Sequence, residues 1–354
     1  MIKTFEFPEV YQLDLDLDQA RRVRAARLIH GFSYRPVERV IANSQKTVHE
    51  VVYIVERICG LCSHSHTTAF CQAVEQAFGL QVPPRARATR SLVAELERLA
   101  DHLLNLGEVA HLLGEKELFA AIWQVRNRAT DLSQQLTGKR VHFGINRIGG
   151  VTMAPWPADL EAAVKSLPDL EAGVEKIEDL FRQRGRSRLA GRGVFKAQPG
   201  SLPGTGPNYR AFGDQRDVRL ERPYAAYESL TLEPVVASNG DSWDRIRVRL
   251  GELGQSLSLI GQLAPNFPGG ELADEPAEVR LVEPQAASSV EAPRGEDVHS
   301  VTISAQGIVE KMAVSVPTTR VIDHLERALI GQAAEDVDLI VASFDLCLAC
   351  RDST

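Results

Sequence analysis

The sequence Arg57-Ile-Cys-Gly-Leu-Cys-Ser-His-Ser-His66, together with a second Cys-x-x-Cys at Cys347 and Cys350, decides how this chain must fold. Two thiolates separated by two residues can bind one metal from a single turn, and four such sulfurs satisfy a soft transition metal. The two pairs lie near opposite ends of the 354 residues. We therefore predict that the N-terminal and C-terminal segments converge on a shared, buried metal site.

The composition is that of an ordinary soluble protein, with 44% hydrophobic residues, 25% charged residues and a net charge of −7. The absence of long Lys/Arg runs argues against a general nucleic-acid binder. No apolar stretch has membrane-spanning length, and the first residues lack the apolar core of a signal peptide. We expect a reducing, cytosolic location, where Cys-x-x-Cys pairs mean metal or redox chemistry more often than disulfides. The fifth cysteine, Cys71, is expected to be a small buried hydrophobic residue.

Apolar residues that recur every three or four positions predict four long amphipathic helices, at 86–113, 117–137, 161–184 and 242–263. Shorter elements are expected as strands at 11–18, 301–304 and 311–316, a strand or short helix at 21–30, and helices at 37–44 and 321–329. The Gly/Pro-rich residues 186–220 and the Pro/Ala/Glu-rich residues 274–293 predict loops, the first of which is of a kind that often packs over a site. The expected fold is mainly α with small peripheral β elements (α+β), around a central antiparallel helical bundle.

No internal repeat or clear linker divides the chain, so we predict a single domain over residues 1–354. Its expected parts are a small β entry region at 1–45, the helical bundle at 47–185 and 242–263, and loops, short strands and the C-terminal metal-binding segment at 186–241 and 264–354.

Spacing alone leaves several kinds of metal site open. Structural zinc sites usually take their ligands from a short stretch and staple a small domain, whereas a large helical core is expected here. Iron–sulfur clusters also tend to draw their cysteines from closer positions in sequence. We therefore use the residues around the cysteines to choose between these kinds of metal site.

Four motifs resemble those of the nickel–iron hydrogenase large subunit. Residues 57–66 resemble its proximal motif R-x-C-G-x-C-x-x-x-H, and Asp345-Leu-Cys-Leu-Ala-Cys350 resembles its distal motif D-P-C-x-x-C. Arg35-Pro-Val-Glu38 is similar to R-G-x-E, and residues 291–299 are similar to E-A-P-R-G-x-x-x-H. The stretches 97–107, 137–150 and 217–227 look like the energy-converting, membrane-associated group, which is related to the quinone-site subunit of respiratory complex I. That relative lacks the four cysteines, so their presence favours a nickel site.

The resemblance implies a catalytic subunit that cleaves H2 reversibly, or reduces protons, with nickel and with iron that carries CO and cyanide; a magnesium ion is also compatible with it. Cys59 and Cys347 match the terminal nickel ligands, and Cys62 and Cys350 match the ligands that bridge nickel and iron. The Cys347 thiolate is the expected first proton acceptor. Glu38 is the expected proton relay, because a carboxyl group in a dry pocket can hold a raised pKa.

The resemblance also assigns groups around the metals. Arg294 is expected above them, with its guanidinium donating towards the cyanide-bearing iron. Asp101 and Asp345 match positions that pair with this arginine, although either can instead cap or salt-bridge locally. His66 is expected to hydrogen-bond the bridging sulfur of Cys62.

Two further histidines have weaker expectations. His299 either orients the arginine loop or has no special role. His64 has no motif position, and we expect a plain core or surface histidine.

Only Cys71 lies outside the two pairs, so no iron–sulfur cluster fits within this chain. The implied partners are a complex-I-like iron–sulfur small subunit, other soluble-arm subunits and membrane subunits that pump ions. The implied place is peripheral, at the cytoplasmic face of a membrane, without a transmembrane segment.

The match is incomplete at three places. Pro36 and Leu346 replace a glycine and a proline that are usual in the family, and the residues after Cys350 lack the usual His or Arg and any removable extension. We expect either a mature chain or a member that skips processing. Two alternative classes stay open, a non-catalytic hydrogenase-like scaffold or assembly protein and a structural zinc protein. The second leaves Glu38 and Arg294 unexplained.

Overall fold

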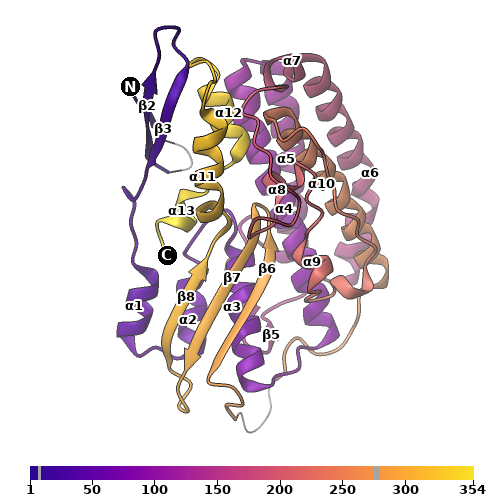
Figure 1. Cartoon of the computed structure of the whole chain (residues 1–354). Coiled ribbons are helices and arrows are strands. Elements are labelled where there is room, and N and C mark those ends of the chain that lie inside the picture. Colours follow the sequence, from indigo (N-terminus) through magenta and orange to yellow (C-terminus); the bar gives the residue numbers. More distant parts are fainter. Residues whose placement is uncertain (7–8, 275–279) are drawn as a thin grey trace.

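The computed structural model describes residues 1–6, 9–274 and 280–354, and it is mainly helical with small antiparallel sheets (Figure 1). The predicted α+β class is therefore confirmed. Within this described part, no helix is both long enough and apolar enough to cross a lipid bilayer.

Four long helices form the bundle, and three of them contain the predicted segments 86–113, 117–137 and 242–263. The fourth covers only 161–180 of the predicted 161–184, whose last four residues lie in a π-helical turn. The four helices are α4 (Pro84–Leu113), α5 (Lys116–Thr137), α6 (Pro157–Leu180) and α10 (Ser242–Leu263). Most of the apolar stripe of α4 is buried in their shared core, including Leu92, Leu96, Leu99, Leu103 and Leu106. Only Gly114 and Glu115 separate α4 from α5, and Gly114 has a φ of 74°, so the chain reverses and the two helices run antiparallel. A π-helical turn, Phe181–Gly185, joins α6 to the short α7 (Arg186–Leu189).

A second layer is built on the three-stranded antiparallel sheet β6–β7–β8 (Gln285–Ala292, Gly295–Ile303 and Val309–Ser315). α3 (Ser63–Phe78) packs on β6 and β7, and α1 (Val37–Ser44) packs on β8. α2 (Val48–Val55) packs on α3, so the residues of α2 and α3 belong mostly to this layer and not to the four-helix bundle.

The loop prediction for residues 274–293 is wrong from Gln285 onward, because these residues form β6; residues 275–279 lie outside the described part. β6 has the sequence Gln-Ala-Ala-Ser-Ser-Val-Glu-Ala, with a single β-branched residue, and its intrinsic β propensity is low. Pairing along its whole length with β7 holds it as a strand.

The N-terminal sheet contains β1 (Ile2–Phe5), β2 (Tyr11–Leu17) and β3 (Val23–Ile29). β2 alternates as predicted, with Leu13 and Leu15 buried and Asp14 and Asp16 exposed. Of the two possibilities for residues 21–30, the strand is the one that forms. This sheet shares a core with α11 (Pro317–Leu329) and α12 (Val337–Phe344), so the first and last parts of the chain lie side by side (Figure 1).

The Gly/Pro-rich connection between α7 and α10 carries only α8 (Pro207–Arg210), α9 (Val218–Glu221) and a 3-10 turn, Tyr227–Ser229. It packs directly against the turn before β7. A Cβ on Gly206 would lie 2.4 Å from the carbonyl oxygen of Arg294, and one on Gly295 would lie 2.2 Å from that of Thr205. Both glycines have positive φ, 111° and 127°. The remaining short elements are the hairpin β4–β5 (Asn146–Arg147, Gly150–Val151), a 3-10 turn at Ala264–Asn266, and α13 (Leu348–Arg351).

Candidate metal centre

The two Cys-x-x-Cys pairs occupy helix ends that face each other. Cys59 lies in the turn after α2, and Cys62 is the residue before the first turn of α3. Cys347 precedes α13, and Cys350 lies within it. The backbone N–H of Cys347 donates to the Thr318 hydroxyl of α11 at 2.9 Å, which holds the C-terminal turn in place. The first pair is thus positioned by the second layer and the other pair by the C-terminal helices.

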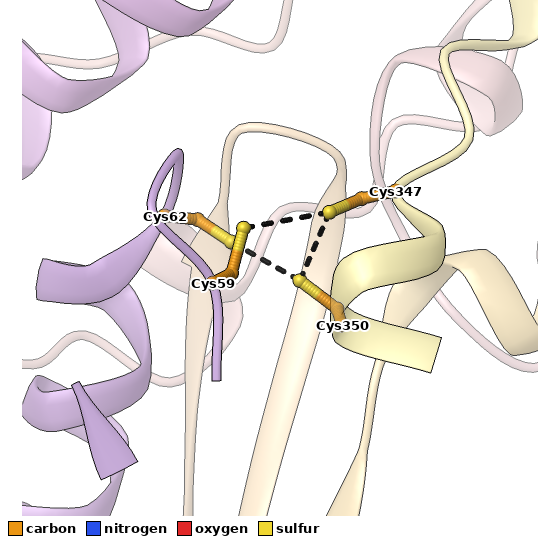
Figure 2. Close-up of side chains that lie close together, drawn as sticks. All are labelled: Cys59, Cys62, Cys347 and Cys350. Atoms are coloured by element: carbon orange, nitrogen blue, oxygen red, sulfur yellow. Dashed lines mark hydrogen bonds between the residues drawn. The ribbon is translucent and has the colours of Figure 1, made fainter. Parts of the chain in front are cut away.

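The four sulfurs converge on one point, as Figure 2 shows. The Sγ–Sγ distances are 3.5 Å for Cys59 and Cys347, 3.3 Å for Cys62 and Cys350, and 3.2 Å for Cys347 and Cys350. All four cysteines are free thiols, and their exposed fractions are between 1% and 5%. The predicted convergence of the two ends of the chain is therefore confirmed.

These donors fit a soft, multiply charged metal centre. Hydrogen bonds among the thiols and burial raise the pKa of Cys62 and of Cys350. Hydrogen bonds from the other three thiols, with a smaller contribution from Arg294, lower the pKa of Cys347 below the ordinary thiol value. Several buried thiolates without a cation are very costly, so bound metal ions would replace the protons. Four buried sulfurs suit nickel, iron or zinc.

A buried arginine near the sulfurs links the helix α4 to the C-terminal segment. Arg294 donates through Nη1 to both carboxylate oxygens of Asp101, at 2.9 and 2.7 Å, and through Nη2 to Oδ1 of Asp345 at 2.8 Å. Its Nε donates to the carbonyl oxygen of Asp345 at 3.0 Å. Asp101 belongs to α4, and Asp345 ends α12 in a left-handed conformation with a φ of 56°. Asp101 and Asp345 therefore both pair with Arg294, which was one of the two possibilities that we expected for them.

The same helix that supplies Asp101 also holds the backbone of the arginine loop. Arg98, one turn earlier on α4, donates to the carbonyl oxygens of Glu291 at 2.6 Å and of Ala292 at 3.3 Å. Burial raises the pKa of Asp101 to about 7, and the guanidinium of Arg294 acts in the opposite direction. Side chain and backbone of this loop are therefore positioned by one rigid element.

His66 points its two ring nitrogens at different partners. Nε2 lies 3.4 Å from Sγ of Cys350, and Nδ1 lies 2.8 Å from Oδ2 of Asp297. The sulfur in contact is thus that of Cys350, whereas we expected that of Cys62. The reason is the geometry of α3: Cys62 caps the helix that carries His66, and the ring is directed across to the facing C-terminal turn. His299 lies 3.1 Å from His66 Nδ1 through its Nε2.

Glu38 occupies the first turn of α1, at the wall of an open groove of about 900 Å³ between that helix and the sheet. Its Oε1 accepts a hydrogen bond from the backbone N–H of Val314 at 2.7 Å. The residue is only half-buried, so it lies at the edge of solvent and not in the dry pocket that we expected.

Sequence reasoning missed the role of Arg35. Its guanidinium donates to the carbonyl oxygens of Arg57 at 3.1 Å, Ile58 at 2.9 Å and Ala349 at 3.0 Å. It therefore links the turns that carry the two cysteine pairs. Its position in the Arg-x-x-Glu pattern did not indicate these bonds, because the acceptors are backbone carbonyls, which every residue has.

Asp352 makes a similar link that no motif indicated. Its carboxylate accepts from the backbone N–H of Gly31 and contacts His30 Nδ1, both at 2.9 Å.

Three other residues lie outside the centre. His64 is a buried core histidine, with Nε2 2.9 Å from the carbonyl oxygen of Arg90, and burial lowers its pKa to about 3. Cys71 is fully buried among apolar side chains, as predicted. Glu97 accepts from Ser65 Oγ at 2.6 Å and from the backbone N–H groups of His64 and Ser65, and burial raises its pKa to about 7. No sequence signal distinguished Glu97 from the other acidic residues of the same helix.

Two family models match the chain. The model described as nickel-dependent hydrogenase matches residues 35–113, and the model described as respiratory-chain NADH dehydrogenase, 49 Kd subunit, matches residues 113–286.

Curated relatives include proteins of both kinds. The carbon monoxide-induced hydrogenase of Rhodospirillum rubrum is 30% identical over 355 residues, 98% of this chain and 96% of that protein. The membrane-bound hydrogenase subunit alpha of Pyrococcus furiosus is 30% identical over 366 residues, 98% of this chain and 84% of that protein. Formate hydrogenlyase subunit 5 of Escherichia coli is 30% identical over 91% of this chain, which spans only 57% of that longer protein. A subunit of the NADH-quinone oxidoreductase of Carboxydothermus hydrogenoformans matches at 30% identity as well, over 96% of this chain and 93% of that protein.

Proposed function

This chain belongs to the family of nickel-dependent hydrogenase large subunits and the related 49 kDa subunits of respiratory NADH dehydrogenase, and we propose that it is the catalytic large subunit of a nickel–iron hydrogenase. The observation that carries the proposal is the convergence of four buried sulfurs beside Arg294. Both kinds of relative are oxidoreductases, and the four converging sulfurs support the hydrogenase assignment because they form a donor set for a soft metal.

The cysteines have distinct roles in this proposal. Cys59 and Cys347 would hold nickel, and Cys62 and Cys350 would bridge nickel to an iron that carries CO and cyanide. When bound, this pair of metals supplies the polarisation that splits H2 into protons and electrons. The Cys347 thiolate would accept the first proton at Sγ.

Glu38 then carries protons to solvent. It lies between the sheet that supports the centre and the open groove, so its carboxylate can exchange protons with water. The Arg294 guanidinium presents a fixed positive charge and N–H donors near the sulfurs, and the two aspartates restrain its orientation. A cyanide nitrogen is a suitable acceptor for such a donor.

The electrons need an outlet outside this chain, because Cys71 is the one cysteine left after the four ligands. We propose a separate iron–sulfur small subunit as this outlet, within a membrane-bound and ion-pumping complex. The chain would lie peripherally at the cytoplasmic face. Relatives that are named as a membrane-bound hydrogenase subunit and as NADH-quinone oxidoreductase subunits support this arrangement.

Metal analysis and infrared spectroscopy of the purified holoprotein test the proposal. One nickel and one iron per chain, with infrared bands of bound CO and cyanide, are expected. Zinc alone would establish a structural metal protein instead. Nickel and iron without hydrogen-dependent dye reduction, when the complex is intact, would favour a non-catalytic scaffold.

The relay is tested separately by Glu38→Gln, which keeps the shape of the side chain and removes its proton exchange. Hydrogen-dependent dye reduction should fall at least about tenfold with both metals retained. Glu310→Gln, at an exposed glutamate of β8, is the matched control and should be fully active. Full activity of Glu38→Gln would remove Glu38 from the proton route.

A further inference from the structure

The strand that follows Arg294 presents two polar side chains to the metal centre. Burial alternates along β7, with Gly295, Asp297, His299 and Val301 buried and the residues between them partly exposed. Strand residues two apart point to the same face. α3 covers that face, and its residue His66 meets Asp297 and His299 there.

The distances connect these groups to one sulfur. Asp297 Oδ2 lies 2.8 Å from His66 Nδ1, and His66 Nε2 lies 3.4 Å from Cys350 Sγ. His299 Nε2 lies 3.5 Å from the same oxygen of Asp297 and 3.1 Å from His66 Nδ1, so the three side chains contact one another. All three residues are at most 1% exposed. The result is a continuous line from a carboxylate through an imidazole to a thiolate.

A carboxylate in this position needs donors, because an unpaired buried charge is very costly. Asp297 Oδ2 faces His66 Nδ1 at 2.8 Å as an ion-pair contact, and neither carboxylate oxygen of Asp297 has a hydrogen bond of good geometry within the described part of the chain. With Nδ1 held in this way, the ring plane is set and Nε2 is the atom that faces Cys350. The Arg-Gly-x-x-x-His pattern gives no role to the position of Asp297.

We propose that Asp297 is a positioning residue, which holds the ring of His66 so that its Nε2 hydrogen-bonds the sulfur of Cys350. The inference rests on the proposed function in one respect, namely that Cys350 is a metal ligand. A hydrogen bond to a ligand sulfur withdraws electron density from it, so Asp297 tunes the metals through His66. His299 contacts Asp297 and His66 and limits the movement of both.

A separate metal ion held by His66, Asp297 and His299 is the competing explanation. His66 Nδ1 and Asp297 Oδ2 are 2.8 Å apart, in direct ion-pair contact. The metal content of the Asp297→Ala variant separates the two explanations.

Infrared spectroscopy of the holoprotein provides the first test. Asp297→Ala should move the CO and cyanide bands to lower wavenumber, because a sulfur that loses its hydrogen bond donates more electron density to the metals. Asp297→Asn keeps an oxygen acceptor and should give a smaller shift in the same direction. The control is Glu296→Gln: this neighbour lies on the other face of β7, where it pairs with Arg222 and Arg320, and its bands should coincide with those of the wild type.

Proton NMR of the metal-free full chain provides the second test and does not depend on the metals. A low-field ring N–H resonance, absent in His66→Gln, should be lost in Asp297→Ala and kept in Glu296→Gln. Unchanged resonances and unchanged bands in Asp297→Ala would overturn the inference, as would a third metal ion that this variant loses. Wild-type protein without CO and cyanide bands would contradict the proposed function alone, and the NMR comparison would still decide the role of Asp297.

Discussion

The link made by Arg35 leads to a sharp prediction, because this one side chain joins the turns of both cysteine pairs. It donates three hydrogen bonds to backbone carbonyls, at 2.9 to 3.1 Å. A buried bond from a charged donor contributes about 1.5–3 kcal/mol, but Arg35 is exposed, so about 0.7 kcal/mol for each bond is appropriate. Arg35→Met should therefore destabilise the chain by about 2 kcal/mol. Arg35→Lys, whose ammonium can donate to one of these carbonyls and so loses two bonds, should cost about 1.4 kcal/mol.

The assay is urea unfolding of the metal-free chain, combined with nickel release from the holoprotein into a chelator. Because the bonds connect residues 57–58 to residue 349, their loss should also speed nickel release, by up to about thirtyfold for about 2 kcal/mol. Arg39→Met, at an exposed arginine one turn later in α1, is the matched control and should change stability by less than about 0.5 kcal/mol. If Arg35→Met and Arg39→Met have the same midpoint and the same release rate, the link has no energetic importance and the reasoning is refuted.

Three further predictions concern buried groups near the centre. Burial raises the pKa of Glu97 from 4.5 to about 7, so the folded chain binds a proton that the unfolded chain has released, and this stabilisation is lost as the pH rises from about 4.5 to about 7. Between pH 5 and pH 8 the wild type should lose about 3 kcal/mol more stability than Glu97→Gln in urea titrations; parallel curves would contradict this. Asp101→Ala leaves the Arg294 guanidinium with a single carboxylate and should lower the free energy of unfolding by about 3 kcal/mol. The double variant with Arg294→Met should recover part of this loss. An equal or greater loss in the double variant would show that the Asp101–Arg294 pair is not the cause of the destabilisation. Cys71→Ala should retain nickel and iron and cost about 1 kcal/mol, while Cys62→Ala should lose both metals, as elemental analysis of the two purified variants would show; metal loss in Cys71→Ala would mean that the wrong thiols have been assigned.

Periodicity predicted the long helices well, because the apolar residues of each helix recur every three or four positions along the sequence. Most of the stripe of α4 is buried in the core, and residues 242–263 match α10 at both ends. β6 was missed, since its small residues have no preference for a strand and only pairing with β7 holds them extended. The assignment of α2 and α3 to the bundle had a similar origin, because amphipathic spacing shows that a face is buried and does not show against what.

The candidate site, too, was predicted only in part from the sequence. Motifs identified the four cysteines, Arg294, Asp101 and Asp345, and the structure brings all of these together. His66 contacts Cys350 and not the expected Cys62, and the expected dry pocket around Glu38 is an open groove. The direction in which a side chain points and its access to solvent depend on the neighbouring helices and strands, which a linear motif does not specify.

The sequence by itself determined which atoms are available for chemistry, namely sulfurs at both ends of the chain, one guanidinium and the acids around it. It also determined that the ends must meet, because four thiolates for one metal centre cannot serve it from a distance. Only the tertiary structure decided how the ends are held and tuned: Arg35 links two turns through carbonyl oxygens, and Asp297 reaches Cys350 through His66. The physical reason is that every residue has a backbone carbonyl that can accept a hydrogen bond, and the helix that packs on a strand determines which groups the polar side chains of that strand contact. Such contacts follow from packing and cannot be read from residue types.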